Sequence, residues 1–346
     1  MWPRRLNRAL AMVRRSRKPG WAKAFERGFA ALARNSLRAS LPSAGIGLKG
    51  RLEKPRPPAG EGDWIAGIAI GSPGARRYRL YRPPDLQSSE RLPLLVMLHG
   101  CGQDAKSFAQ STRMNRIAAR ERFLVLYPEQ DRLANGQGCW NWFDSRGGRA
   151  AGEAQLIMTA VDQVCLLYRA DRSRVAVAGL SAGASMAALL ATRHPERFKA
   201  VVMHSGVAPS AANSTASALA AMRGRRSAKP LAPVLPVDAA AWPPLLVIHG
   251  AADHVVAASN GRDAVKIWAD AVGARPVVAR SVQRGKRYPM NVTAFEAAGR
   301  TVATLVEVEQ LAHAWSGGAA SQAYGDVQGP DASRLSWAFI ASRFRA

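Results

Sequence analysis

The segment Gly-Leu-Ser-Ala-Gly at residues 179–183 places a serine between two glycines, directly after the apolar run at 175–178. Glycines let a strand and a helix approach closely, and the pattern G-x-S-x-G is typical of a sharp strand-to-helix turn that exposes the serine hydroxyl. The helix that follows would direct its N-terminal N–H groups towards the space beside that hydroxyl. The pattern predicts a nucleophilic Ser181, and a glycine-rich turn with a solvated serine is the alternative.

A serine hydroxyl is a weak nucleophile near neutral pH and needs a histidine base that an acid orients. On such a turn, the acid and then the histidine are expected further along the chain, each after a strand. His313, in QLAHAWSGG, is the only histidine after the last predicted strand, and we predict it to be the base. His194 is interpreted as a surface or capping residue, and three histidines that end apolar runs as structural ones: His99, His204 and His249.

Asp253, in the segment LLVIHGAADHVV, is the predicted acid. It lies at the C-terminal end of a predicted strand, where open α/β sheets carry their active-site loops, and it comes between Ser181 and His313. Capping of the next helix is its alternative role. Asp263 and Glu307 are weaker candidates, because one falls inside a predicted helix and the other inside a predicted strand.

Backbone N–H groups for a developing negative charge are predicted at two places. Ala182 directly follows the serine. Cys101 follows the predicted strand LLVMLHG and lies between Gly100 and Gly102, whose freedom favours a loop there; the adjacent Gln103 is predicted to contact substrate. Cys101 is expected to act through its N–H rather than its sulfur, and a cysteine nucleophile is the rival interpretation.

Strands and helices alternate along most of the chain, which predicts an α/β fold with a mostly parallel, doubly wound sheet and helices on both faces. Two β segments open the pattern, at 63–70 and 76–84. Further strands are predicted at 92–100, 124–130, 173–180, 199–206, 243–253 and 304–313. Helices are predicted at 107–123, 152–169, 182–198, 260–273 and 331–344.

Charge and composition divide the chain into two expected parts, a basic arm with a linker at 1–62 and a catalytic domain at 63–346. The net charge of the 346 residues is +25, and residues 1–56 hold 15 Lys and Arg against two acidic residues, a net of +13. A basic surface favours polyanions, acidic membranes or acidic substrates. Inside the domain, the Ala/Ser/Pro-rich residues 208–242 are interpreted as a lid or a disordered insertion.

The basic arm contains four apolar residues at helical spacings of three and four, and these predict an amphipathic basic helix. Such a helix would bind an anionic surface or pack on the catalytic domain. The residues are Trp21, Phe25, Phe29 and Leu32.

Hydrophobic residues make up 48% of the chain, which is enough for a sizeable core, and no apolar run reaches the ~18 residues of a membrane span. The N-terminus shows no secretory signal pattern, so a cytoplasmic location is predicted. The three cysteines have neither zinc-site spacing nor a C-x-x-C pattern. We predict no metal and no cofactor.

Five segments together resemble the poly(3-hydroxybutyrate) depolymerase-family esterases, a group that includes feruloyl and acetylxylan esterase-like members. They are HGCGQ (99–103), CWNWFD (139–144), GLSAG (179–183), HGAADHVV (249–256) and HAWSGG (313–318). The resemblance spans roughly residues 64–340. It implies an α/β-hydrolase fold and the hydrolysis of carboxylic esters through an acyl-enzyme.

The resemblance also supports the site residues one by one. It implies that Trp142 and Trp315 are aromatic walls of the site, with core packing as the alternative, and that Cys101 could pair with Cys139. Many members of the family are extracellular, which is the alternative location. Secreted polymer depolymerases carry a signal peptide and a polymer-binding domain that this sequence does not show, which argues against attack on crystalline polyester. The implied nucleophile, acid, base and two oxyanion donors are Ser181, Asp253, His313, Cys101 and Ala182.

Two functions from different classes remain open. The first is a serine esterase that acts on hydroxyalkanoate oligomers or polyester, or on short acyl and aromatic esters. The second is a binding protein with a hydrolase fold that docks on a polyanionic or granule surface through residues 1–56. The expected partners are an ester substrate and an anionic surface, and no specific nucleic-acid site is predicted.

Overall fold

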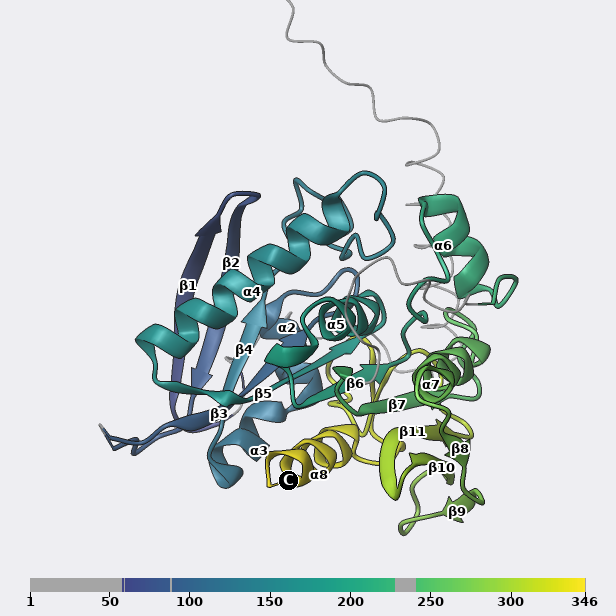
Figure 1. The fold of residues 1–346 in the computed structure, drawn as a ribbon. Helices are drawn as coiled ribbons and strands as arrows, with labels where there is room; N and C mark the ends of the chain where they lie inside the picture. The colour runs from purple at the N-terminus through teal and green to yellow at the C-terminus, as the bar shows by residue number, and fades with distance from the viewer. Residues whose placement is uncertain (1–57, 59, 88, 228–240, 346) are drawn as a thin grey trace, which may run out of the picture.

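The computed structural model describes residues 58, 60–87, 89–227 and 241–345. Residues 1–57 and 59, which include the predicted amphipathic helix and most of the predicted arm and linker, lie outside the described residues, as does the segment 228–240 of the predicted insertion. Within the described residues, a single large sheet forms the centre of the molecule and helices cover both of its faces (Figure 1). This is the mostly parallel, doubly wound arrangement that the sequence predicts.

The strands of the main sheet lie in the order β1-β2-β4-β3-β5-β6-β7-β11-β10-β8, and β9 pairs with β10. The central strands from β4 to β11 pair in parallel, whereas β1, β2 and β10 pair antiparallel to their neighbours. The strands are β1 (Asp63–Gly71), β2 (Gly74–Arg82), β3 (Leu92–Leu98), β4 (Leu124–Pro128), β5 (Ala170–Leu180), β6 (Ala200–His204), β7 (Leu245–Gly250), β8 (Arg275–Pro276), β9 (Arg280–Val282), β10 (Met290–Ala297) and β11 (Arg300–Val308). A separate two-stranded sheet pairs β12 (Trp315–Ser316) with β13 (Gly325–Asp326).

Two hydrophobic cores lie on opposite faces of the sheet. Strand β3 shows why, because successive side chains of a strand point to opposite faces: Leu94 and Val96 belong to one core and Leu95 to the other. Helices α4 (Arg149–Leu167), α5 (Ala182–Arg193), α6 (Thr215–Met222) and α7 (Ser259–Ala271) pack on the first face. Helices α2 (Ala105–Thr112), α3 (Met114–Glu121) and α8 (Ala332–Phe344) pack on the second.

The structure differs from the sequence prediction in several elements besides the short strands β8, β9, β12 and β13, which were not predicted. The helix predicted at 107–123 is two helices, α2 and α3, because Arg113 adopts a left-handed conformation (φ 54°) that ends the first one. A hairpin of β10 and β11 stands where only a strand at 304–313 was predicted. Residues 208–227 carry the helix α6, and Ala221 and Met222 of this helix are buried in the first core. At least this part of the predicted insertion is therefore integrated into the domain.

Candidate active site

The turn at Ser181 joins the end of β5 to the start of α5 without any intervening loop. Ser181 has φ 56° and ψ −121°, a conformation that residues other than glycine rarely adopt. A Cβ at Gly179 would lie 2.3 Å from the backbone of Gly183, and a Cβ at Gly183 would lie 2.1 Å from the carbonyl oxygen of Leu98. Both glycines are therefore required for the close approach of helix and strands, as the pattern G-x-S-x-G predicts.

Hydrogen bonds hold this strained turn in place. The N–H of Ser181 donates to the carbonyl oxygen of His204 on the neighbouring strand β6 (2.9 Å). The carbonyl oxygen of Ser181 accepts from the N–H of Ser185 (3.1 Å), which begins the hydrogen-bond ladder of α5. Ser181 is only 5% exposed, so its hydroxyl lies in a pocket and not on an open surface.

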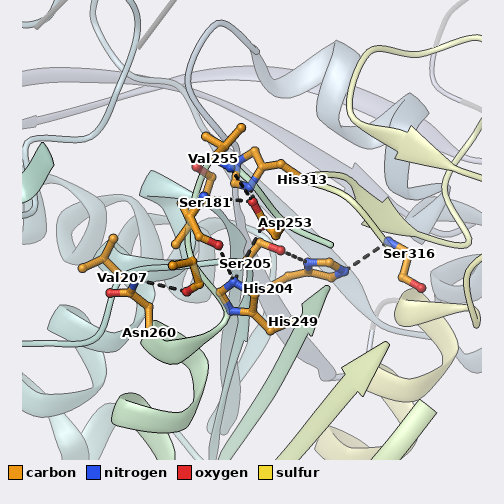
Figure 2. A network of polar contacts seen from close by, with 12 residues as sticks. Ser181, His204, Ser205, Val207, His249, Asp253, Val255, Asn260, His313 and Ser316 are labelled. Carbon is orange, nitrogen blue, oxygen red and sulfur yellow. Dashed lines mark hydrogen bonds and ion pairs between the residues drawn. The ribbon is translucent and has the colours of Figure 1, made fainter. Parts of the chain in front are cut away.

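Asp253 and His313 form a buried pair at the C-terminal ends of β7 and β11. An ionised carboxylate only accepts hydrogen bonds, so Nδ1 of His313 donates to Oδ2 of Asp253 (2.8 Å). The other oxygen of Asp253 accepts from the N–H groups of Val255 (2.9 Å) and Val256 (2.8 Å), as Figure 2 shows in part. The carboxylate is thus fixed by three donors, and Nε2 of His313 is left for another partner.

The electrostatics of Asp253 keep its carboxylate ionised. Burial alone would raise the pKa of this carboxyl, but the charge and hydrogen bond of His313, with help from His249 and the Val256 N–H, lower its pKa to about 2. His249 itself lies with Nε2 3.7 Å from Oδ2 of Asp253 and 2.9 Å from the carbonyl oxygen of Val256. A permanently charged Asp253 can orient and stabilise a histidine that gains a proton.

Ser181 and His313 line the same narrow pocket, together with Gln103 and Tyr324. Cys101 and Ala182 lie beside it, at 6% and 7% exposure, and we find no acceptor for the N–H of either residue within the described part of the chain. The structure therefore brings together all five predicted residues of the nucleophile, acid, base and oxyanion donors. Two donors that face one pocket beside a nucleophile could bind an oxyanion.

The loop that carries Cys101 is held in several ways. Oε1 of Gln103 accepts from the N–H of Gly100 (3.0 Å), and the N–H of Gln103 donates back to the carbonyl oxygen of Gly100 (3.2 Å). A disulfide joins Cys101 to Cys139, which settles the pairing that the sequence left open. Nε1 of Trp140 donates to the carbonyl oxygen of His99 (3.0 Å), so a second contact joins the two loops.

A second pocket adjoins Ser181 on the other side and is mostly apolar. Residues far apart in the sequence form its walls, and its free volume is about 20 Å³, roughly enough for one water molecule. Trp142, a predicted wall residue, lines it. The other contributors besides Ser181 and its oxyanion neighbours are Cys139, Trp140, Phe143, Ser185, Val207, Ala218, Met222 and Val256.

Trp315 is not a wall of either pocket, and the prediction that it contacts substrate is wrong. Its side chain is fully buried and packs on His204, with ring centroids 4.9 Å apart, and on Phe108 at 5.6 Å. Its Nε1 donates to Oγ of Ser333 (3.0 Å). A large ring whose N–H is hydrogen-bonded is well suited to the core. Core packing was the alternative interpretation of this residue.

Two of the three histidines at strand ends, His99 and His204, hold neighbouring segments through hydrogen bonds, whereas His249 lies against Asp253. Nε2 of His99 accepts from the N–H of Gln130 (3.1 Å), and Nε2 of His204 accepts from the N–H of Ser316 (3.1 Å; Figure 2). Burial disfavours their charged forms and lowers the pKa of His99 to about 4 and that of His204 to about 3. Both are therefore neutral near pH 7 and act as hydrogen-bonding parts of the core.

Two searches restricted to the described residues bear on other functions. We find no group of His, Cys, Asp and Glu side chains arranged to hold a metal ion among them. None of their helices is long and apolar enough to cross a membrane.

Comparison with known proteins identifies the family. A family model described as esterase PHB depolymerase matches residues 76–278, which is more than half of the chain. The chain belongs to this family. The matched segment includes Ser181, Asp253 and both oxyanion donors, whereas His313 lies beyond it.

Two relatives from this comparison carry different names. The chain is 31% identical over 190 residues to poly(3-hydroxyalkanoate) depolymerase C of Paucimonas lemoignei, a match that covers 50% of this chain and 44% of that protein. It is 31% identical over 193 residues to feruloyl esterase B of Neurospora crassa, covering 52% of this chain and 65% of that protein. The chain thus spans less than two thirds of the length of either relative.

Among solved structures, an acetyl xylan esterase from Aspergillus awamori resembles this chain with a TM-score of 0.58 and 19% identity, over 81% of this chain and all of that chain. At this identity the likeness shows the fold alone. Together with the sheet order described above, it confirms the α/β-hydrolase fold that the sequence predicts.

The segment CWNWFD (139–144) is held by a buried glutamate that the sequence analysis did not identify. Glu153 on α4 is 5% exposed and accepts from the N–H of Asn141 (2.8 Å), from its side-chain amide (2.6 Å) and from Nε2 of Gln130 (2.6 Å). The same Gln130 donates to the carbonyl oxygen of Cys139 (2.9 Å). A glutamate in the middle of an otherwise apolar helix face was the available signal.

Proposed function

We propose that this chain is a serine carboxylesterase. Ser181 is the nucleophile, His313 the general base and Asp253 the acid that orients it. The N–H groups of Cys101 and Ala182 form the oxyanion hole. Membership of the esterase PHB depolymerase family supports the reaction class, and the site geometry supports the roles of the five residues.

The observation that carries this proposal is the placement of the buried Asp253–His313 pair against the pocket of Ser181. The 2.8 Å bond at Nδ1 selects the tautomer in which Nε2 carries a lone pair. That lone pair is what a serine hydroxyl needs as a proton acceptor. Catalytic hydrogen bonds often tighten only when substrate binds, so a shared pocket is the relevant geometry in the free enzyme.

In the first half of the reaction, Oγ of Ser181 attacks the carbonyl carbon of the ester, and its proton passes to Nε2 of His313. The carbonyl oxygen becomes an oxyanion that accepts from the N–H groups of Cys101 and Ala182. Collapse of this intermediate breaks the bond to the alcohol oxygen. His313 returns the proton to the leaving alcohol, and the acyl group stays on Ser181.

In the second half, a water molecule gives a proton to Nε2 of His313 and attacks the acyl-enzyme. The same two N–H groups stabilise the second oxyanion. Its collapse releases the carboxylic acid and restores the Ser181 hydroxyl with the proton from His313. Asp253 remains ionised throughout, because the pKa of its carboxyl lies at about 2.

The apolar pocket between Trp142, Met222 and Val256 is proposed to hold the acyl group, and Gln103 and Trp142 are proposed to contact substrate. This pocket favours acyl groups that are small or that enter after side chains move. Esters of short hydroxyalkanoates, short acyl chains and aromatic acids are the proposed substrates. Named relatives that are a poly(3-hydroxyalkanoate) depolymerase and a feruloyl esterase support this range.

The test is a hydrolysis panel of p-nitrophenyl esters, hydroxybutyrate oligomers and methyl ferulate, run on the wild-type chain and on Ser181→Ala. We expect a burst of alcohol release with the wild type and none with the variant, because only the serine forms an acyl-enzyme. Equal turnover by both proteins would overturn the proposal.

Location and domain organisation remain proposals. The Cys101–Cys139 disulfide favours an oxidising compartment, so we propose the extracellular location over the cytoplasmic one. We also propose residues 63–346 as one catalytic domain and residues 1–62 as an arm. The net charge of +13 in residues 1–56 supports docking of the arm on an anionic surface, and a purely binding role is the second candidate function.

A further inference from the structure

A cavity of about 640 Å³ lies apart from the Ser181 site and is lined by six arginines. None of its lining residues takes part in either pocket at Ser181. One carboxylate, that of Asp331, lines it. The six arginines are Arg113, Arg116, Arg120, Arg284, Arg287 and Arg334, and we call this cavity the arginine cleft.

Three separate chain segments supply these arginines. Arg113, Arg116 and Arg120 come from α3 and its N-cap, Arg284 and Arg287 from the connection between β9 and β10, and Arg334 from the first turn of α8. Figure 1 shows α3 and α8 side by side below the sheet. The cluster is therefore a product of the tertiary fold and not of one basic stretch of sequence.

Two of the six guanidinium groups are already bonded to the backbone. Arg113 donates to the carbonyl oxygen of Gly317, and Arg287 donates to those of Val327 (3.2 Å) and Gly329. These contacts fix one wall of the cleft. The other four arginines are exposed and are available for a ligand.

The four exposed arginines have little negative charge to balance them. Arg120 pairs with Glu121 at 2.8 Å, and Nε of Arg334 lies 3.8 Å from Oδ2 of Asp331. Arg116 and Arg284 have no acidic partner among the described residues. Arginine stays charged at all physiological pH values, so the like charges that gather here are only partly compensated by nearby carboxylates.

Helix electrostatics make this placement unfavourable without a ligand. Arg116 and Arg334 stand in the first turns of α3 and α8, where the helix dipole disfavours positive charge. Arg116 and Arg120 are four residues apart on one helix face, a spacing at which like charges repel. Arg113, the N-cap residue of α3, gives no side-chain cap, although Oγ1 of Thr112 accepts from the N–H of Met114 (3.3 Å). An anion in the cleft would reverse each of these unfavourable effects.

We propose that the arginine cleft binds a compact polyanion with several phosphate or sulfate groups. Guanidinium groups bind tetrahedral oxyanions through paired N–H donors, and a cavity of this volume is in the range of small-molecule sites. Residues 1–56 of the same chain carry a net charge of +13 and so offer the cleft little neutralisation, which favours a separate molecule as its occupant. A small ligand fits a cavity of this volume better than a long nucleic acid, which needs an extended basic surface.

The test measures binding of tripolyphosphate and of sucrose octasulfate to the full chain by titration calorimetry, at low and at high salt. The Arg116→Gln/Arg284→Gln variant removes the two exposed arginines that lack acidic partners. The matched control is Arg77→Gln/Arg91→Gln, which changes the net charge equally at two exposed arginines outside the cleft. Neither variant touches the proposed catalytic residues, and ester hydrolysis serves as the check that each is folded.

We expect one molecule of at least one probe to bind per chain, with affinity that falls as salt rises. The cleft variant should bind about tenfold more weakly or worse, and the control should bind like the wild type. The preferred probe distinguishes a phosphate ligand from a sulfate ligand. Equal weakening in both variants would show non-specific attraction to the basic chain and overturn the proposal. The proposal would also be overturned if neither small probe bound and a DNA duplex bound in a way that required Arg116 and Arg284.

Discussion

The Ser181 site and the arginine cleft differ in how their charged groups are buried and paired. At the Ser181 site, the single carboxylate of Asp253 is buried and fully hydrogen-bonded, and the pockets beside it are narrow. In the arginine cleft, six positive charges surround a wide cavity and most are exposed. Preorganised charge in a dry pocket suits bond chemistry, because it need not rearrange during the reaction. Accumulated charge around an open cavity suits capture of a ligand from solution.

The largest expected effect is the loss of ester hydrolysis on substitution of Ser181, and it should distinguish the Ser181 site from the arginine cleft. Ser181→Ala should lower kcat by at least about 10³-fold, because the members of a triad act as a unit. It should leave polyanion binding at the arginine cleft unchanged. Esterase assays and calorimetry on the same preparation measure both. Near-normal hydrolysis by a purified, folded variant would contradict the assignment of the nucleophile.

Substitution of two nearby histidines tests the choice of base. His313→Gln should lower kcat by a similar factor, since no other group in the pocket can accept the proton of Ser181. His254→Gln is the matched control, because His254 adjoins Asp253 in sequence and is exposed. If the control is inactive and His313→Gln keeps its activity, the base has been assigned to the wrong residue.

Acid should destabilise the core around the Ser181 site before it affects the arginine cleft. The folded protein keeps His99 and His204 neutral, with pKa values lowered to about 4 and 3, whereas the unfolded chain protonates them near 6.5. Since the unfolded state binds more protons, stability falls as pH decreases from about 6.5 to 3, by up to ~1.4 kcal/mol per pH unit for each histidine. Asp253, with its pKa near 2 in the folded state, contributes stability above about 4 that is lost as pH falls further.

Urea unfolding at pH 7, 5 and 3.5 measures this dependence. His204→Gln should be less stable at pH 7 but should show a shallower decline with acid, because one of the buried histidines with a lowered pKa is gone. A decline as steep as that of the wild type would show that His204 does not titrate on unfolding.

A substitution in the proposed acyl pocket should alter the preference for acyl chain length more than the overall rate of hydrolysis. Met222→Ala should raise kcat/KM for longer acyl chains relative to acetate by about tenfold, because the shorter side chain leaves space in the pocket for one or two extra methylene groups. Ala220→Gly on the same helix, at a position that does not line the pocket, is the control. A p-nitrophenyl ester series from C2 to C8 gives the ratio, and an unchanged ratio would place the acyl group elsewhere.

Truncation of the basic arm should have the smallest effect on chemistry. A chain that begins at Asp63 should hydrolyse soluble esters normally, because no proposed catalytic residue precedes it. It should lose co-sedimentation with anionic vesicles, which in the full chain should weaken as salt rises. Loss of hydrolysis would show that the arm packs on the catalytic domain, and equal sedimentation would rule out its docking role.

Local patterns allowed much of the site to be predicted. The turn at Ser181 could be predicted from five consecutive residues, because glycines on both sides of a serine, between an apolar strand and a helix, favour a sharp turn. Asp253 and His313 followed from chain order, since the carboxyl ends of parallel strands share one edge of the sheet. Such features depend on neighbours in sequence or on topology, and both can be read without coordinates.

Features that depend on tertiary contacts could not be predicted in this way. The hairpin of β10 and β11 turns at Ala298 and Gly299, both with positive φ, and it lacks the Asn-Gly or Asp-Gly signal of such turns. Trp315 has a large aromatic side chain of the kind that often lines a pocket. Only its contacts with His204 and Phe108 show that it belongs to the core. The arginine cleft joins three distant segments, none of which is unusual alone.

The disulfide also defines a covalent ring within the chain. Cys101 and Cys139 are separated by 38 residues, and the ring between them contains α2, α3 and β4. Closing a loop of this length lowers the entropy of the unfolded chain and is worth about 4 kcal/mol of stability in the chain-entropy model. The ring includes Cys101, the proposed oxyanion donor, and also Arg113, Arg116 and Arg120 of the arginine cleft. One cross-link thus constrains, in the unfolded ensemble, segments that contribute to both proposed sites.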